Sequence, residues 1–356
     1  MRYNTKIFLS LLAALLGYAL FANAHHESIS STQPVPEERA GSTTPLRIFY
    51  YTESNRPYES ANANIEKISV LAPQSYSIDR KGSLHGKPST RILELTREHN
   101  VKLMPLVTNG RFNKFIMRDI LQSPTAQKRA IKALADEAVR EGYWGWQFDF
   151  ENFHARHKNR YSKFVRDAAL AFHERGLILS VAVVAQHSEN PKAYRANTWT
   201  YWAGPFDYKA LGQYADFITL MAYDDDFSKG PSAGLPWVKK VLAFALEQIP
   251  PEKLSLGIPL YYWEWDELHQ KRVGTGGYFK VASLLEAEKI LAQGWDTTLE
   301  APWIRYMKNG RIRKIWYENP ESFEKKFELV AANNLHGFSA WALGREDPKI
   351  WEILAP

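Results

Sequence analysis

Short apolar runs alternate with longer amphipathic stretches from Leu46 to the end of the chain, and this alternation constrains the fold more than any other feature. Such a pattern is typical of α/β proteins, in which helices connect parallel strands. Eight runs have the length and composition of strands: Leu46–Thr52, Ser69–Ile78, Val101–Val107, Trp144–Phe150, Leu177–Ala185, Phe217–Tyr223, Leu254–Tyr262 and Gly337–Leu343. Eight strands with intervening helices predict a (β/α)8 TIM barrel.

The connections between these runs have helical periodicity, in Ala126–Arg140, Arg160–Arg175, Trp237–Gln248 and Glu321–Asn333. The last connection is much longer than the others, so we expect a small α+β insertion at about 264–317, between strands seven and eight. Within it, residues 303–307 and 311–319 should form a hairpin around Lys308-Asn309-Gly310, and Val281–Ala292 should form a helix.

The N-terminus has the organisation of a secretory signal over residues 1–24. Arg2 and Lys6 precede an apolar stretch, and Ala22-Asn23-Ala24 provides small residues for cleavage. The apolar stretch is shorter than the roughly 20 residues that a bilayer-spanning helix needs, which favours export to the periplasm or medium over an uncleaved membrane anchor. Residues 25–45 are rich in Ser, Thr, Pro and Glu and are expected to form a flexible linker before a folded domain at 46–356.

The composition excludes several kinds of chemistry. None of the 356 residues is cysteine, so disulfides, thiolate nucleophiles and Cys-ligated zinc are ruled out. The chain has 45 basic and 39 acidic residues, a net charge of +6, but the basic residues are dispersed, and we expect no nucleic-acid partner. We interpret the basic hairpin with Arg305, Lys308, Arg311, Arg313 and Lys314 as a solvated face, with a modest attraction for anionic cell-wall polymer as the alternative.

The fourth strand carries two acids in the segment WGWQFDFEN, residues 144–152. Because side chains alternate along a strand, Gln147, Asp149 and Glu151 share one face and the aromatic side chains between them share the other. In a barrel the aromatic face packs under the helices, and the polar face points inward toward the C-terminal mouth, where barrel active sites lie. Taken alone, the segment also fits an edge strand of an antiparallel sheet with one wet face.

This segment resembles the D-G-x-D-x-D-x-E signature of family 18 glycoside hydrolases, the chitinase-like barrels, with its last three polar positions at Gln147, Asp149 and Glu151. Residues 220–224 (LMAYD) resemble the M-x-Y-D motif that ends the sixth strand of this family. Residues 256–261 (LGIPLY) resemble its seventh strand.

Trp341 stands where the family keeps a tryptophan at the end of the eighth strand. The resemblance runs from about Leu46 to the end of the chain, and it is strongest to the bacterial subgroup that includes spore-cortex and peptidoglycan-active N-acetylglucosaminidases.

The resemblance implies a retaining glycosidase that cleaves β-linked N-acetylglucosamine polymers, with the acetamide of the substrate as the nucleophile. Glu151 would be the general acid, and the nearby charge of Asp149 should help it stay protonated. By resemblance, Asp149 would orient the acetamide and support the oxazolinium intermediate, Tyr223 would hydrogen-bond the acetamide oxygen, and Trp341 would form the floor of the sugar site.

Further residues are assigned to substrate binding. Met221 and Asp224 belong to the M-x-Y-D match. Four tryptophans follow strands five and seven, where they either line sugar subsites or pack in the core: Trp199, Trp202, Trp263 and Trp265. Of these, Trp265 is assigned to the substrate.

Gln147 departs from the family pattern, since many members have Asp at this position. An amide can hydrogen-bond Asp149 but cannot share a proton as an acid, which puts a relay through three carboxyl groups in question. Some members of the resembling subgroup carry an amide here, so we do not interpret Gln147 as inactivation. The alternative function is a non-catalytic chitin- or N-acetylglucosamine-binding lectin of the same fold. Such lectins typically lack the acid, and the presence of Glu151 favours an enzyme.

We expect neither a metal nor a cofactor. His154 and His157 have a spacing that fits a metal, but no third ligand is apparent, and we place them on a solvated loop or helix. The run Asp224–Asp226 suggests calcium, but its first residue belongs to the M-x-Y-D match and the others are expected to be solvated. The sequence leaves open the polymer, chitin or peptidoglycan or another glycan, as well as endo or exo action and the oligomeric state.

Overall fold

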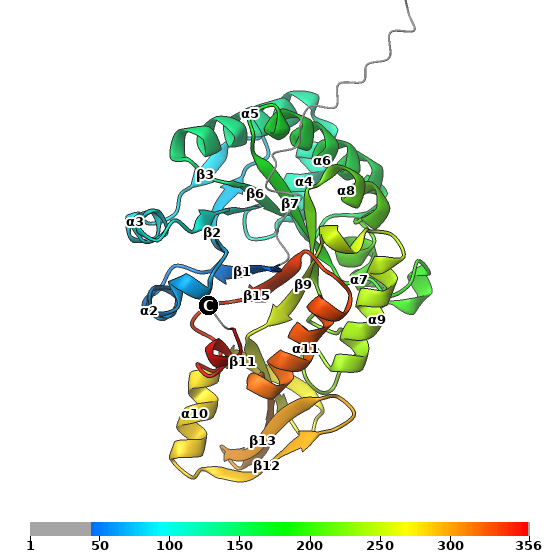
Figure 1. The fold of residues 1–356 in the computed structure, drawn as a ribbon. Coiled ribbons are helices and arrows are strands. Elements are labelled where there is room, and N and C mark those ends of the chain that lie inside the picture. The colour runs from blue at the N-terminus through cyan, green and yellow to red at the C-terminus, as the bar shows by residue number, and fades with distance from the viewer. Residues whose placement is uncertain (1–43, 355–356) are drawn as a thin grey trace, which may run out of the picture. The chain divides into compact units, whose positions relative to one another are not determined.

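A computed structural model describes residues 44–354, so the expected signal at 1–24 and nearly all of the expected linker at 25–45 lie outside the described residues. Eight parallel strands form a closed barrel (Figure 1). In chain order they are β1 (Leu46–Tyr51), β2 (Val70–Ile78), β5 (Leu106–Thr108), β6 (Gly145–Asp149), β7 (Ile178–Val184), β8 (Phe217–Met221), β9 (Leu254–Pro259) and β15 (Gly337–Trp341). The barrel closes because β1 pairs with both β2 and β15. The predicted (β/α)8 barrel is confirmed.

The third barrel strand is divided into two pieces. A short β4 (Lys102–Leu103) pairs with β2, and β5 begins only after Pro105, whose carbonyl accepts from Gln147 N at 3.1 Å. Proline has no N–H to donate to the ladder, so an interruption at this residue is expected. A further short strand, β3 (Leu84–Gly86), pairs antiparallel with the end of β2 beyond the barrel.

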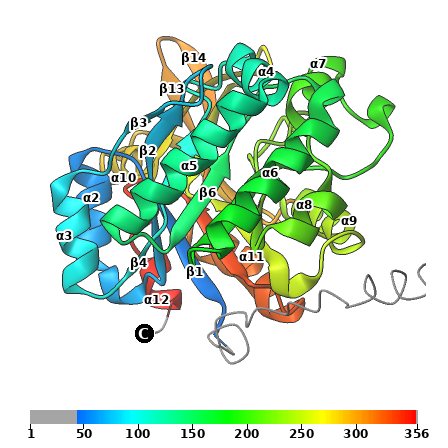
Figure 2. The ribbon, with the colours of Figure 1, turned by 90° about the horizontal axis from the view of Figure 1, so that it is seen from above.

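Helices surround the barrel (Figure 2). They are α2 (Asn55–Ala63), α3 (Thr90–Glu98), α4 (Lys114–Gln122), α5 (Pro124–Glu141), α6 (Lys158–His173), α7 (Ala196–Thr198), α8 (Tyr208–Tyr214), α9 (Leu235–Leu246), α11 (Pro320–Ala332) and α12 (Ile350–Ile353). The four predicted helices correspond to α5, α6, α9 and α11. In the part of the chain from 44 to 354, no helix combines the length and the apolar character needed to cross a bilayer.

The aromatic face of β6 packs outward against α5 and α6, as predicted. Trp146 is fully buried and donates from Nε1 to the Leu134 carbonyl at 2.9 Å. Phe148 stacks on Phe164 of α6, with ring centroids 5.7 Å apart. Removing a buried ring of this kind typically costs about 3–5 kcal/mol. This packing therefore fixes which face of β6 points into the barrel.

The insertion between β9 and β15 is a five-stranded antiparallel sheet with one helix on its face, seen below β9 and β15 in Figure 1. Its elements are β10 (Tyr261–Asp266), β11 (Lys271–Gly277), α10 (Tyr278–Glu286), β12 (Ile290–Asp296), β13 (Ala301–Lys308) and β14 (Arg311–Trp316). The sheet starts earlier than the expected 264, because the run expected as one strand at 254–262 divides between β9 of the barrel and β10 of the insertion.

The predicted hairpin is confirmed by β13 and β14, whose turn residues Asn309 and Gly310 have φ angles of 50° and 69°. These are the left-handed conformations that a tight two-residue hairpin requires. The predicted helix Val281–Ala292 is wrong in its second half. It ends at Glu286, the chain turns through Glu288 with φ 51°, and the apolar residues that follow form β12, which pairs with β13.

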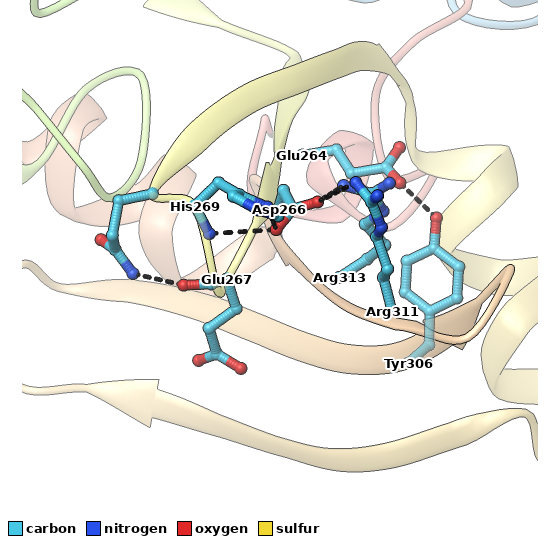
Figure 3. A network of polar contacts seen from close by, with 8 residues as sticks. Glu264, Asp266, Glu267, His269, Tyr306, Arg311 and Arg313 are labelled. Carbon is cyan, nitrogen blue, oxygen red and sulfur yellow. Dashed lines mark hydrogen bonds and ion pairs between the residues drawn. The ribbon is translucent and has the colours of Figure 1, made fainter.

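The basic hairpin is not simply a solvated face, which corrects that expectation. Asp266 is buried and accepts hydrogen bonds from Arg313 Nη1 at 2.7 Å and from His269 Nδ1 at 2.9 Å (Figure 3). Arg313 has only 14% of its side chain exposed. On the same strand, Glu264 accepts from Lys280 of α10 at 2.6 Å and from Tyr306 of β13. Two buried acids thus tie β10 to the elements around it.

Burial alone would raise the pKa of Asp266, but the hydrogen bonds from His269 and the charge of Arg313 lower it to about 2. We predict that Asp266→Asn destabilises the protein at neutral pH, because Arg313 loses its partner. The free energy of unfolding of the wild type should exceed that of Asp266→Asn by its full amount above the ordinary aspartate pKa of about 3.9. This difference should be lost as the pH falls toward 2. Urea unfolding at several pH values measures this, with the exposed Glu286→Gln as control. A difference between Asp266→Asn and wild type that does not change with pH would contradict it.

Candidate active site

Two acids of the fourth strand lie together inside the mouth of the barrel. Asp149 ends β6 and has 4% of its surface exposed, and Glu151 follows two residues later, partly exposed. The two carboxyl groups influence each other's pKa, and the side chain of Gln74 also acts on the pKa of Asp149. Burial raises the pKa of Asp149 to about 6. Burial and then the charge of Asp149 raise the pKa of Glu151 well above its usual value. The pair therefore holds a proton near neutral pH.

One side chain hydrogen-bonds both the backbone N–H and the backbone carbonyl of Glu151. Asn109, fully buried after β5, accepts from Glu151 N at 3.1 Å and donates from Nδ2 to the Glu151 carbonyl at 2.8 Å. The next residue, Asn152, has a φ of 54° and donates to the Phe112 carbonyl at 2.9 Å. The loop after β5 and the chain after β6 are thus joined by side-chain amides, and this fixes the direction of the Glu151 side chain.

A layer of neutral polar side chains lies below the acids. Gln147, with no exposed surface, donates from Nε2 to Ser180 Oγ at 2.9 Å and to Thr219 Oγ1 at 2.8 Å. The Ser339 hydroxyl lies within hydrogen-bond distance of Thr219, at 3.2 Å, and of Ser255, at 2.7 Å. These five residues come from five barrel strands in succession, β6, β7, β8, β9 and β15. Within residues 44–354, Gln147 Oε1 has no hydrogen-bond donor.

Aromatic side chains line the opposite side of the mouth. Trp341 ends β15, is partly exposed, and has its ring centroid 5.1 Å from that of Tyr50; the Trp341–Ala342 peptide is cis. Tyr223 follows β8, and its ring lies 6.1 Å from that of Tyr261. Burial raises the pKa of Tyr223 well above its usual value, so its hydroxyl stays a neutral donor. Met221 is the partly buried last residue of β8.

Asp224 lies on the same rim, and the structure gives it partners of its own. It is exposed, with a φ of 62°, and accepts from the Tyr261 hydroxyl at 2.6 Å. Its backbone N–H donates to Ser232 Oγ at 3.0 Å. The charge of Asp224 contributes to the raised pKa of Glu151, after burial and Asp149. Asp224 therefore belongs electrostatically to the site.

The tryptophans assigned to the mouth differ in surroundings. Trp263 and Trp265 pack with Trp316 in a cluster that also contacts Tyr223 and Trp341. Trp265 is 9% exposed and donates from Nε1 to the Gly230 carbonyl at 2.9 Å, so it fastens the loop after β8 to the insertion sheet. Its contact with substrate stays a prediction. Trp199 and Trp202 are partly buried in a short π-helical segment, Trp199–Ala203.

His157 is buried at the end of a short 3₁₀ turn, which corrects the expectation of a solvated position. Its Nε2 accepts from Arg156 Nε at 3.4 Å. Asp225 and Asp226 are partly buried rather than fully solvated. Across residues 44–354 no group of three or more His, Cys, Asp or Glu side chains is arranged to hold a metal ion.

Sequence reasoning did not identify Gln74, Asn109 or Tyr50 as residues of the site. Burial raises the pKa of Tyr50, and Thr219 and Ser339 of the layer below the acids act against this rise. The one available signal was position, since Gln74 and Asn109 lie near the C-terminal ends of barrel strands two and three, where functional residues of such barrels gather.

Comparison with known proteins agrees with this geometry. The family model of the glycosyl hydrolases family 18 matches residues 47–346. The cortical fragment-lytic enzyme of Bacillus subtilis (strain 168) is 30% identical over 300 residues, which cover 81% of this chain and 67% of that protein.

Solved structures match the whole barrel. The spore cortex-lytic enzyme SleL of Bacillus cereus is 27% identical with a TM-score of 0.77, covering 87% of this chain and 73% of that one. A chitinase from Chromobacterium violaceum is 25% identical, also with a TM-score of 0.77, covering 87% of this chain and 98% of that one. The chain is therefore a glycoside hydrolase and belongs to glycosyl hydrolases family 18.

Proposed function

We propose that this protein is a retaining glycosidase that hydrolyses β-linked N-acetylglucosamine polymers, with Glu151 as general acid and the substrate acetamide as nucleophile. The observation that carries this proposal is the pair of Asp149, which is buried, and Glu151 at the C-terminal end of β6, because burial raises the pKa of both acids. A protonated acid in a barrel mouth is what departure of a glycosidic leaving group needs. Sugar binding alone does not require such a proton, so the pair favours an enzyme over a lectin.

The chemistry follows from this pair. Glu151 donates its proton to the bridging oxygen while the acetamide oxygen of the sugar attacks the anomeric carbon, so the glycosidic bond breaks and an oxazolinium ion forms. The Asp149 carboxylate stabilises the positive charge and holds the acetamide N–H. Glu151, now a base, takes a proton from a water molecule. The oxygen of this water attacks the anomeric carbon and opens the oxazolinium, so the product has the original β configuration.

The aromatic side of the mouth would hold the sugar. The neutral Tyr223 hydroxyl donates to the acetamide oxygen, and the Trp341 ring packs against the apolar face of the sugar. Met221 and Asp224 would contact the same sugar. The relatives include a cortical fragment-lytic enzyme and a chitinase. We therefore propose a polysaccharide that contains N-acetylglucosamine as the partner, and export through the N-terminal signal as the route to it.

Glu151→Gln should leave the fold intact and lower kcat by about 100- to 10,000-fold, because the amide cannot donate a proton to the leaving oxygen. Initial rates on N-acetylglucosamine oligomers measure this, with circular dichroism to verify folding. Glu286→Gln, on the exposed face of α10, is the matched control. Activity of Glu151→Gln within a few fold of wild type would rule out Glu151 as the acid.

The proposed nucleophile predicts that the sugar on the non-reducing side of the cut must keep its N-acetyl group. Fully deacetylated oligomers should not be cleaved, and early products from acetylated oligomers should be the β anomer when followed by NMR. An initial α anomer, or equal cleavage of deacetylated chains, would show that the acetamide is not the nucleophile.

Asn109→Ala should lower kcat by about 10- to 100-fold with little change in KM, because the Glu151 main chain loses both of its bonds to this side chain and the acid loses its direction. Asn113→Ala is the control. It removes the cap of α4 in the same loop, where the Asn113 side chain accepts from Phe115 N, and should cost about 1 kcal/mol of stability without lowering kcat. Equal kinetic losses in both variants would show that Asn109 acts only through loop stability.

A further inference from the structure

A cavity of about 600 Å³ lies on the side of the barrel that adjoins β6. It is formed by the ends of β2 and β5 and the loop that follows β5. Two of its lining residues lie next to β6 or act on Asp149 at its end. Thr108 of β5 is the register partner of Asp149 in β6, and Gln74 of β2 influences the pKa of Asp149. A sugar in this cavity would therefore adjoin the sugar held at the acids.

The lining of this cavity combines Tyr76 and Phe112 with several small polar side chains. Ser75, Ser77, Thr108 and Gln74 offer hydroxyl and amide groups, and none of the 12 tryptophans of the chain lines it. The other side of the mouth is aromatic, with Trp341 and Tyr223 contacting the tryptophan cluster of the insertion. The two sides thus suit different sugars, an apolar ring face on one and a substituent rich in hydrogen-bonding groups on the other.

Arg111 brings a positive charge to the cavity wall. Its side chain is exposed, and within residues 44–354 it has no acidic partner. By contrast, Arg91 pairs with Glu53 and Arg80 pairs with Asp119. The Arg111 guanidinium therefore remains available to an anion from solution.

The position of Arg111 is fixed relative to Glu151. Arg111 and Phe112 both have φ angles of 52°, a left-handed conformation that side chains other than glycine rarely adopt. The Phe112 carbonyl accepts from Asn152 at 2.9 Å, and Asn109, which holds Glu151, also donates to the Asn113 carbonyl at 3.3 Å. The loop that presents the guanidinium is thus bonded to the chain that presents the acid.

We propose that this cavity is a subsite for a sugar that bears a carboxylate, and that Arg111 binds this carboxylate and so determines specificity. The inference rests on the proposed function and deepens it. Chitin is uncharged, whereas a peptidoglycan-type glycan carries lactyl or peptide carboxylates on the sugar next to N-acetylglucosamine. A guanidinium donates two parallel N–H groups to a carboxylate, and such charge-assisted bonds correspond to about 10- to 100-fold in affinity.

The test compares three substrates that differ in charge: neutral N-acetylglucosamine oligomers, peptidoglycan glycan fragments with free carboxylates, and the same fragments with those carboxylates amidated. Wild type should show a kcat/KM about 10- to 100-fold higher on the free acid than on the amidated glycan, and added salt should reduce this ratio. Arg111→Gln should abolish the preference, mainly through KM, and Arg111→Lys should retain part of it. Arg80→Gln, which removes the same charge from an arginine outside the cavity, should keep the wild-type ratio.

Two results would overturn the subsite while leaving the proposed function intact. One is cleavage of acid and amidated glycans at equal rates by wild type. The other is an equal loss on all three substrates in Arg111→Gln, which would indicate a structural role for the loop. Failure of wild type to cleave any of the three would instead refute the proposed function, and the subsite with it.

Discussion

Exclusion of water from the end of β6 is the constraint on which the site depends. In water, two carboxylic acids of this kind would both be ionised at neutral pH, and neither could donate a proton. Burial raises the pKa of Asp149 from 3.8 to about 6, so keeping this group charged in the folded protein costs free energy. The stability of the packed barrel around Asp149 offsets that cost. The aromatic face of β6, with Trp146 and Phe148 locked under α5 and α6, contributes to the stability that offsets it.

The alternation of side chains along β6 then determines which residues can share this buried environment. Because side chains alternate, the residue two positions before Asp149 must also point into the barrel, at a greater depth. Here it is Gln147, whose amide hydrogens are both used by Ser180 and Thr219. A third carboxylate at that depth would add another desolvated charge below the pair. The neutral amide fills the position with hydrogen bonds and adds no titrating group below Asp149 and Glu151.

The sequence predicted the parts of the molecule that depend on local periodicity. Alternation in β6 placed Gln147, Asp149 and Glu151 on the inner face, and the tight turn at Asn309-Gly310 placed the insertion hairpin. Contacts between distant segments were not predictable in this way. The bonds from Asn109 to Glu151 span 42 residues, and nothing in either local pattern indicates them. The second half of the expected helix at 281–292 was wrong because a short apolar run fits a helix or a strand equally well until its neighbours are known.

The same limit applies to the tryptophans after strand seven. They pack near Tyr223 and Trp341, but whether a ring faces solvent depends on the loop after β8, where the Gly230 carbonyl accepts from the indole N–H of Trp265. This hydrogen bond has a consequence for the site as a whole. The aromatic side of the mouth is braced by the insertion sheet, and the polar side is bonded through Asn109 to the chain of Glu151. Because each side is held by its own packed or hydrogen-bonded unit, the acid, the tyrosine and the tryptophan are oriented before substrate arrives, and little of the binding energy has to be used to order them.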